Sequence, residues 1–425
     1  MTPLQTTSLI VLACIVALSI WKKTNIGLLG YAGAFGIALL ADIDPNEALG
    51  AFPAKLVVLI IGVALLFAHA ERSGAISWLV ELALRPIGHR RWVIPWVAFA
   101  ASAALSSIGA LPAAPISLLV PIMARLARTY RLNYLVLASI VVWAANAGGL
   151  SPLSPAGALV QTIAQKADVS YSPWLLYGIM LVLFAVATAV LIGAEKWIRF
   201  VGRGRSLDAA EETPPPSEPV TNSGDGRPGG YALASLGSLL ALIVGAIAFQ
   251  LDVGLSALTL AMVLQLVFQP PEKDIVAKVP WPVILLLSGL IVYLHLLETI
   301  GTMKSIEDAL GHIDSTVLLL VVLCYVTAIV SNMESSALVV LGVMVPIGLQ
   351  GAQHSPGEAL AVIIAVVMCT MVVAISPVHI GGALIIGNTR TEEQQHAVRW
   401  LFVMAGIASA LVPALVVLFP VIVGT

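Results

Sequence analysis

The sequence is poor in charged residues, which make up only 10% of its 425 positions, while hydrophobic residues make up 59%. A typical soluble domain carries roughly 25% charged residues. So few charges cannot cover a surface that faces water, and the mean hydropathy of +0.99 agrees with this. The composition therefore excludes an ordinary soluble protein. It predicts that the lipid bilayer covers most of the protein surface.

Several functional motifs are also missing. The net charge of −2 gives no electrostatic basis for binding nucleic acid, and the three cysteines show no metal-ligand spacing. The chain has no Walker phosphate loop, no His-Glu-x-x-His zinc motif and no evident Ser-His or paired-Asp constellation. We therefore expect neither an enzyme nor an ATP-driven pump, and no cofactor beyond a coupling ion, Na⁺ or H⁺.

Long apolar runs predict membrane spans, since one span needs about 20 mostly apolar residues. The runs fall at about 7–21, 26–41, 55–70, 134–148, 173–194, 232–249, 253–268, 282–297, 358–375 and 400–421. Two further stretches, 92–127 and 316–350, are interrupted in the middle by small and polar residues. We expect an all-α polytopic membrane protein with roughly ten to twelve spans.

The first half is bounded by an apolar run at its start and by a polar segment at its end. No basic residue precedes the run 7–21, whereas Lys22 and Lys23 follow it, which is the opposite polarity to a cleaved signal peptide. We expect a retained first span with its N-terminus outside. Residues 201–230 are rich in Pro, Gly, Ser and charged residues, so they predict a disordered linker between a first transmembrane repeat, 1–200, and a second, 231–425.

The two sides of this linker resemble each other in sequence. Glu71-x-x-Gly74 recurs 227 residues later, and other matches recur at a shift of 225. The matched segments are Glu71-x-x-Gly74 with Glu298-x-x-Gly301, Val120-Pro121-Ile122 with Val345-Pro346-Ile347, and Ser151-Pro152 with Ser376-Pro377. Because prolines match prolines in a steady register, we infer an internal duplication.

Topology decides how the repeats are oriented. If 92–127 and 316–350 are re-entrant hairpins, each half crosses the membrane five times, and the second repeat is inverted. This arrangement puts 18 of the 21 basic residues on the cytoplasmic side, as the positive-inside rule requires. The exceptions are Lys55, Lys166 and Lys304. We expect a multi-pass protein of the inner (plasma) membrane, with the linker in the cytoplasm and an interfacial amphipathic helix at 75–84.

Four segments break the apolar pattern, two in each half. The first hairpin tip holds Ser106, Ser107 and Gly109; the first broken span holds Asn146, Gly149, Ser151, Pro152 and Ser154; the second tip holds Ser331, Asn332, Glu334, Ser335 and Ser336; and the second broken span holds Ser376, Pro377, His379 and Gly381. Irregular backbone at membrane depth survives only where it lines a protein cavity. Helix N-termini exposed at such breaks attract anions, and carbonyl ends suit Na⁺. We expect these residues to form one site for a small anion and an ion.

The ionisable residues leave alternatives open. Glu334 is either a proton-coupling group or a water-facing residue at the outer rim. His379 binds a carboxylate, shuttles protons or is a core histidine. Glu71, Arg72 and Glu298 lie near span ends, where interfacial snorkelling or a local ion pair explains them better than chemistry does.

At these breaks the sequence resembles the ion transporter superfamily, which includes the divalent anion:sodium symporters. The stretch from Asn146 to Pro155 is similar to the malonate/C4-dicarboxylate carrier branch, and Ser331-Asn332 resembles the second-tip motif Ser-Asn-Thr. Two positions depart from the family pattern: Ser107 stands where the motif has Asn, and Glu334 where it has a small or hydroxyl residue.

The resemblance implies a transport domain that moves past a homodimeric scaffold by an elevator-type motion. It also implies Na⁺ sites, one near Ser106, Ser107 and Asn146 and one near Ser331, Asn332 and Ser376. The expected function is secondary active transport of a small organic anion, a malonate-like or C4 dicarboxylate, driven by Na⁺ or H⁺. Efflux of an inorganic oxyanion and cation/proton antiport are the alternatives on the same fold.

Overall fold

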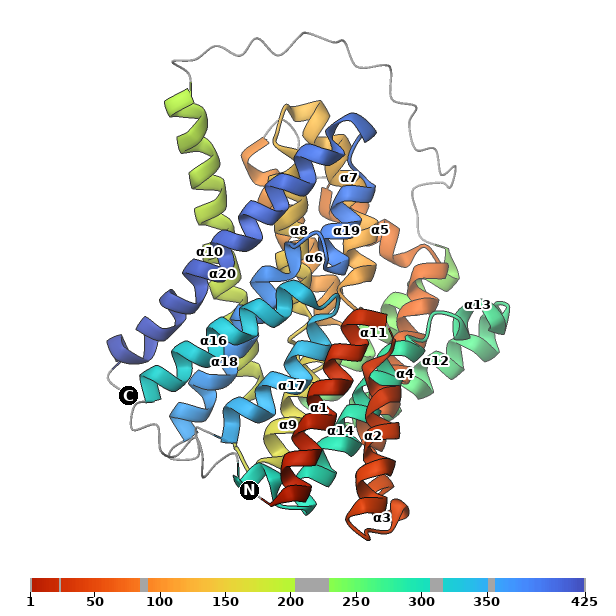
Figure 1. Ribbon diagram of the computed structural model, residues 1–425. Coiled ribbons are helices and arrows are strands. Elements are labelled where there is room, and N and C mark those ends of the chain that lie inside the picture. The colour runs from red at the N-terminus through yellow and green to blue at the C-terminus, as the bar shows by residue number, and fades with distance from the viewer. Residues whose placement is uncertain are drawn as a thin grey trace.

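The computed structural model describes residues 2–22, 24–84, 91–202, 229–305, 316–350 and 356–423. Every regular element in these ranges is a helix, as the composition predicts (Figure 1). Six helical stretches are long and apolar enough to cross a membrane: Ala54–Arg72, Pro173–Trp197, Gly230–Ala248, Trp281–Thr299, Glu358–Gly387 and Thr391–Val416. The expected all-α class, with several helices able to span a membrane, is therefore confirmed for the described residues. The expected linker, 201–230, lies almost entirely outside the described residues.

The described helices form two series, in which α1–α4 and α6–α10 have counterparts in the same order, α11–α14 and α16–α20. The first series is α1 Pro3–Lys22, α2 Ile26–Leu40, α3 Pro45–Leu49, α4 Ala54–Arg72, α5 Ala75–Leu84, η2 Arg91–Val93, α6 Ile94–Ser107, α7 Ala113–Tyr130, α8 Tyr134–Gly148, α9 Pro155–Lys166 and α10 Pro173–Gly202. The second is α11 Gly230–Ala248, α12 Val253–Phe268, α13 Glu272–Val276, α14 Trp281–Thr299, α16 Thr316–Met333, α17 Ala337–Gln350, α18 Pro356–Val372, η3 Val373–Ile375, α19 Ile380–Gly387, η4 Thr391–Glu393 and α20 Gln394–Val423. Helices α12, α13 and α14 each begin 227 residues after α2, α3 and α4.

Local sequence explains why matched helices begin where they do. The side chain of Asn25 accepts a hydrogen bond from the Gly27 amide at 2.9 Å and caps α2. Asp252 does the same for α12, accepting from the Leu255 amide at 2.8 Å. A side-chain oxygen that accepts from a free amide of the first turn stabilises a helix start by about 1 kcal/mol. The same device therefore sets the start of the same helix in each series.

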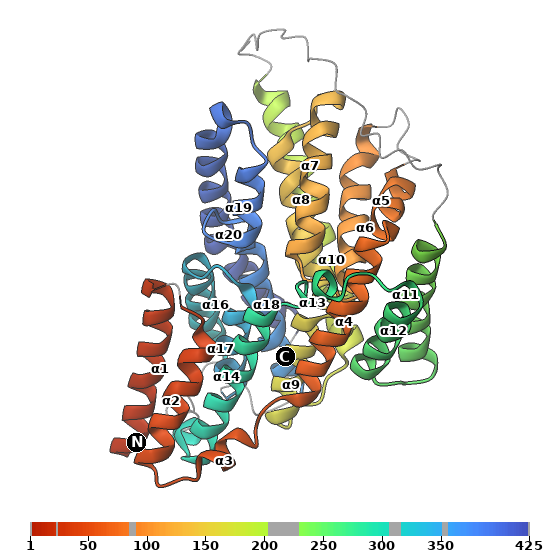
Figure 2. The same cartoon turned by 90° about the vertical axis from the view of Figure 1, so that its right-hand side faces the viewer.

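Two pairs of glycines join the two series. A Cβ added at Gly289 in α14 would overlap the carbonyl of Gly27 in α2, and one added at Gly62 in α4 would overlap the carbonyl of Gly254 in α12. Small residues of this kind let helix backbones approach closely, which is how apolar helices associate in lipid. Figure 2 shows α1, α2 and α14 together at the lower left and α4, α11 and α12 together at the right. Each half thus packs a helix on the other half.

Helix pairs lie at the two stretches where hairpins are expected. Helices α6 and α7 meet at a tip formed by residues 108–112, and α16 and α17 meet at residues 334–336. Helices α10 and α20 pack against α8 and α18, respectively. The hairpins and the interrupted helices thereby lie within the helical body, and residues 75–84 form the expected helix, α5.

Candidate functional site

Two helix breaks share one backbone geometry. The first, residues 149–154, separates α8 from α9, and the second, residues 373–379, separates α18 from α19. The amide of Ser154 donates to the carbonyl of Ser151 at 2.9 Å, and the amide of His379 donates to that of Ser376 at 2.9 Å. Each break thus forms a tight turn from which a new helix starts.

Glycines make these turns possible. A Cβ added at Gly157 would overlap the carbonyl of Ser151, and one added at Gly382 would overlap the carbonyl of Ser376. The prolines of the two breaks, Pro152 and Pro377, are half-buried in the same turns. The predicted positions of both breaks are therefore those at which the helices end.

The two breaks lie side by side although they are far apart in the sequence. Asn146 Nδ2 donates to the Met371 carbonyl at 3.4 Å, and Trp143 Nε1 donates to the Val372 carbonyl at 2.9 Å. These bonds satisfy two carbonyls at the end of α18 that have no hydrogen-bond partner within the helix. The structure thus brings together Asn146 from one predicted segment and the start of the other predicted break.

The first hairpin tip closes on the first break. Gly109 has φ +106°, a conformation that favours glycine, and an added Cβ there would overlap the Val63 side chain and lie 3.1 Å from the Leu153 carbonyl. A Cβ on Gly149 would lie 3.2 Å from Pro112 Cγ at the tip. The tip and the break therefore touch through backbone and small residues.

The second tip is tied to the second break by a backbone hydrogen bond. The amide of Ile380, the first residue of α19, donates to the Ser335 carbonyl at 3.2 Å. The matched position in the first half is Pro155, which has no N–H to donate. The second tip is thus bonded to its break in a way that the first tip cannot reproduce.

Four buried side chains at the tips and breaks have an atom without a hydrogen-bond partner in the described part of the chain. The atoms are Ser106 Oγ, Ser154 Oγ, Ser376 Oγ and His379 Nε2, and their residues are 0%, 0%, 0% and 6% exposed. Seven other such atoms lie elsewhere in the protein. Buried polar groups are normally hydrogen-bonded, so these four atoms have the capacity to bond a polar ligand.

Two other predicted site residues are engaged in structural bonds. Ser107 Oγ lies 2.7 Å from the Tyr177 hydroxyl of α10, and Asn332 Nδ2 donates to Ser409 Oγ of α20 at 2.6 Å. Sequence reasoning missed Tyr177 and Ser409, because a single hydroxyl in an apolar span gives no local signal. The structure therefore uses these matched positions to hold the hairpins against α10 and α20.

The carboxylate of Glu334 lies in the second tip, before α17 begins at Ala337. Its Oε1 accepts from the amide of Ser335 at 2.9 Å and from that of Ser336 at 3.3 Å, so it bonds within the tip itself. Ser331 donates its hydroxyl proton to the Thr370 carbonyl at 3.1 Å, which joins α16 to α18.

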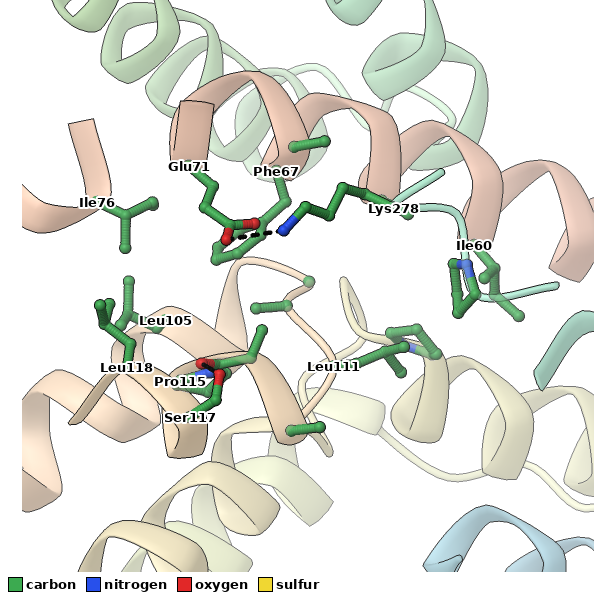
Figure 3. Close-up of a pocket in the computed structure, with 18 of the residues that line it drawn as sticks. Ile60, Phe67, Glu71, Ile76, Leu105, Leu111, Pro115, Ser117, Leu118 and Lys278 are labelled. Atoms are coloured by element: carbon green, nitrogen blue, oxygen red, sulfur yellow. Dashed lines mark hydrogen bonds and ion pairs between the residues drawn. The ribbon is translucent and has the colours of Figure 1, made fainter. Parts of the chain in front are cut away.

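A cavity of about 600 Å³ leads to this junction (Figure 3). Residues of α4 and α5 form one side, and Leu111, Pro115, Ser117 and Leu118 of the first hairpin form the other. The cavity also contacts the first residues of α9 and α19, namely Pro155 and Ile380. Its lining is mostly apolar. The residues with the four unpartnered atoms, Ser106, Ser154, Ser376 and His379, are not among its lining residues.

One ion pair lies at the wall of this cavity. Lys278 Nζ is 3.0 Å from Glu71 Oε1, and the side chains are 55% and 47% exposed, so the cavity reaches solvent beside them. The sequence placed Glu71 at a span end, but it did not reveal its partner, because Lys278 comes from the other half of the chain.

Comparison with known proteins gives one family. Residues 1–149 match the family described as dicarboxylate carrier protein MatC N-terminus, and this match ends within the first break. No curated protein matches the chain. The match supports the resemblance to the dicarboxylate carrier branch. The first third of this chain, from α1 to the end of α8, is therefore similar to the N-terminal part of the MatC dicarboxylate carriers.

Proposed function

We propose that this protein is a secondary active transporter of a small dicarboxylate. The observation that carries the proposal is the group of four unpartnered buried polar atoms at the junction of two helix breaks and two hairpin tips. The similarity of residues 1–149 to dicarboxylate carriers supports a carboxylate as the ligand.

The junction offers suitable groups for two carboxylates. Helices α9 and α19 both begin at the breaks, and their positive dipole ends attract anions, although Pro155 has no N–H and the amides of Ile380 and Gly381 are already hydrogen-bonded. The hydroxyls of Ser154 and Ser376 and the Nε2 of His379 add hydrogen-bond donors. A carboxylate at each helix start is therefore the proposed mode of binding, with Na⁺ or H⁺ as the coupling ion.

The proposed architecture is a pair of inverted repeats, each with a re-entrant hairpin, in a plasma membrane with the N-terminus outside. The reciprocal glycine contacts support it, since Gly27 with Gly289 and Gly62 with Gly254 are the same contact with the halves exchanged. Reciprocal contacts of this kind are expected of halves related by a two-fold axis.

Alternating access is supported by a difference between matched contacts. Gly342 of α17 packs against α14, where an added Cβ would lie 2.6 Å from Leu290 Cδ2. The matched residues are Ser117 of α7 and Val63 of α4, and here Ser117 is exposed and lines the cavity. We infer a state open towards the Glu71 side and closed on the other. An elevator-type motion on a homodimeric scaffold would exchange the two contacts.

The test is uptake into liposomes that contain the purified protein. Labelled malonate and succinate are supplied outside, with an inward Na⁺ gradient and an inward H⁺ gradient imposed in separate experiments. Saturable accumulation that depends on one gradient is expected. Uptake that neither gradient drives, or that never saturates, contradicts secondary active transport of dicarboxylates.

A further inference from the structure

The cavity beside the junction is lined by one pair of oppositely charged residues. Among the described residues that line it, only Glu71 and Lys278 carry a charge, and their ion pair closes at 3.0 Å (Figure 3). The rest of the lining is mostly alkyl, with the hydroxyls of Ser77 and Ser117. A carboxylate in this cavity would therefore find one cation, the Lys278 ammonium.

Lys278 lies just before the start of α14. Pro280, two residues further on, is the N-cap residue of this helix and also lines the cavity. The amides of Trp281 and Val283 donate to the carbonyls of Val279 and Pro280, and Pro282 has no N–H. The attraction for an anion at this point therefore comes from the ammonium group of Lys278.

The pair is also easy to exchange. Both side chains are about half exposed, and exposed ion pairs contribute little to stability because water competes for both charges. Glu71 can turn into solvent, since its carboxylate accepts no other hydrogen bond that the structure records. Another carboxylate can therefore take its place at Lys278 without leaving a buried charge unpaired.

We propose that Lys278 is a carboxylate-binding residue on the substrate's path, and that Glu71 occupies it when no substrate is there. This inference rests on the proposed function. A dicarboxylate that enters or leaves through the cavity displaces Glu71 from Lys278, passes along the hairpin, and releases Lys278 to Glu71 again. The ligand class is a small anion with a free carboxylate.

A second ion pair provides the matched control. Arg72 Nη1 lies 2.6 Å from Asp274 Oδ2 and joins the same two segments, the end of α4 and the residues before α14. Neither Arg72 nor Asp274 lines the cavity. A merely structural role would give the two pairs the same importance, whereas a binding role requires only Lys278 and Glu71.

The experiment compares Lys278→Gln, Lys278→Arg and Glu71→Gln with Arg72→Gln and Asp274→Asn in proteoliposomes, using succinate. Lys278→Gln is expected to raise KM about threefold with a smaller change in kcat, which corresponds to about 0.7 kcal/mol of binding free energy, the range of a half-exposed ion pair. Lys278→Arg retains most of the affinity. Glu71→Gln lowers KM, since it removes the competing carboxylate. Both control variants keep the KM of the unchanged protein.

Two outcomes would overturn the proposal. One is a KM of Lys278→Gln equal to that of the unchanged protein, and the other is an equal rise in KM for Arg72→Gln. If Lys278→Gln does not fold, the fall in KM of Glu71→Gln and the retained affinity of Lys278→Arg decide the question. The failure of the proposed function looks different, because the unchanged protein would then accumulate no succinate at all.

Discussion

Asn146 donates a hydrogen bond to the carbonyl of Met371, the residue 225 positions further along the chain. The shift of 225 is also the one that matches Ser151-Pro152 with Ser376-Pro377, so Asn146 contacts its own counterpart. Such a contact is expected only close to a two-fold axis, where a residue faces its equivalent. In the proposed inverted repeat, this axis runs between α8 and α18 and through the proposed site.

The glycine contact between α2 and α14 makes a prediction about stability. Gly289→Ala should lower the free energy of unfolding by about 1–3 kcal/mol, because the added methyl overlaps the Gly27 carbonyl and forces the helices apart. Gly36→Ala in α2 is the control, since a Cβ there meets nothing within 4 Å. It should leave stability unchanged or raise it slightly. Thermal unfolding in detergent measures both, and equal shifts would contradict the packing argument.

Ser117 lines the cavity, whereas its counterpart Gly342 is packed against α14, so the two positions should differ in chemical labelling. In a Cys14→Ser background, Ser117→Cys should react quickly with a membrane-impermeant maleimide added on the Glu71 side, because Ser117 is exposed in the cavity. Gly342→Cys should react slowly from either side. An imposed substrate gradient should slow the first reaction and speed the second. Labelling of both positions at the same rate throughout would speak against alternating access.

The unpartnered Nε2 of His379 predicts a loss of substrate affinity on substitution. His379→Gln should reduce the free energy of succinate binding by that of one hydrogen bond to a charged group, about 1.5–3 kcal/mol. This is roughly a 10- to 100-fold rise in KM. His396→Gln is the control, because His396 is exposed on α20. Unchanged KM in His379→Gln would remove this residue from the site.

Substitution of Glu334 tests whether H⁺ is the ion that drives transport. Glutamine keeps the oxygen that accepts from the amides of Ser335 and Ser336, but it cannot bind or release a proton at neutral pH. If Glu334 carries the coupling proton, Glu334→Gln should abolish the stimulation by a pH gradient while succinate exchange continues. Glu47→Gln, an exposed residue of α3, should behave like the unchanged protein. Full pH-driven uptake in Glu334→Gln would refute proton coupling through this residue.

The sequence predicts much of the fold because lipid imposes simple rules. The runs 134–148 and 253–268 coincide with α8 and α12, and Pro152 and Pro377 lie in the two breaks where helices end. Proline and glycine act on the backbone locally, so their effect can be read without knowledge of the tertiary structure. The ends of the helices at the two breaks therefore follow from local sequence. The tips begin later than expected, since Ser106 and Ser107 lie in α6 and Ser331 and Asn332 lie in α16.

The partners of the site residues do not follow from local sequence. The sequence does not show that the amide of Asn332 meets Ser409 on α20. It predicts snorkelling or an ion pair for Glu71 at a span end, but it does not show that the partner is Lys278. Both partners lie far away along the chain, and only the packing of helices decides which distant side chains meet. Pairs of this kind can therefore be identified only from the structure.

The exchange of helices between the halves has a consequence for biosynthesis. Helices α2 and α4 leave the ribosome early, but the helices that cover their glycine faces, α14 and α12, are made only after the whole first half and the linker. The nascent first half is therefore an unfinished body in the membrane, with its close-packing surfaces facing lipid until the second half is inserted. A first half made alone would therefore keep these glycine faces towards lipid until a segment that contains α12 and α14 is supplied.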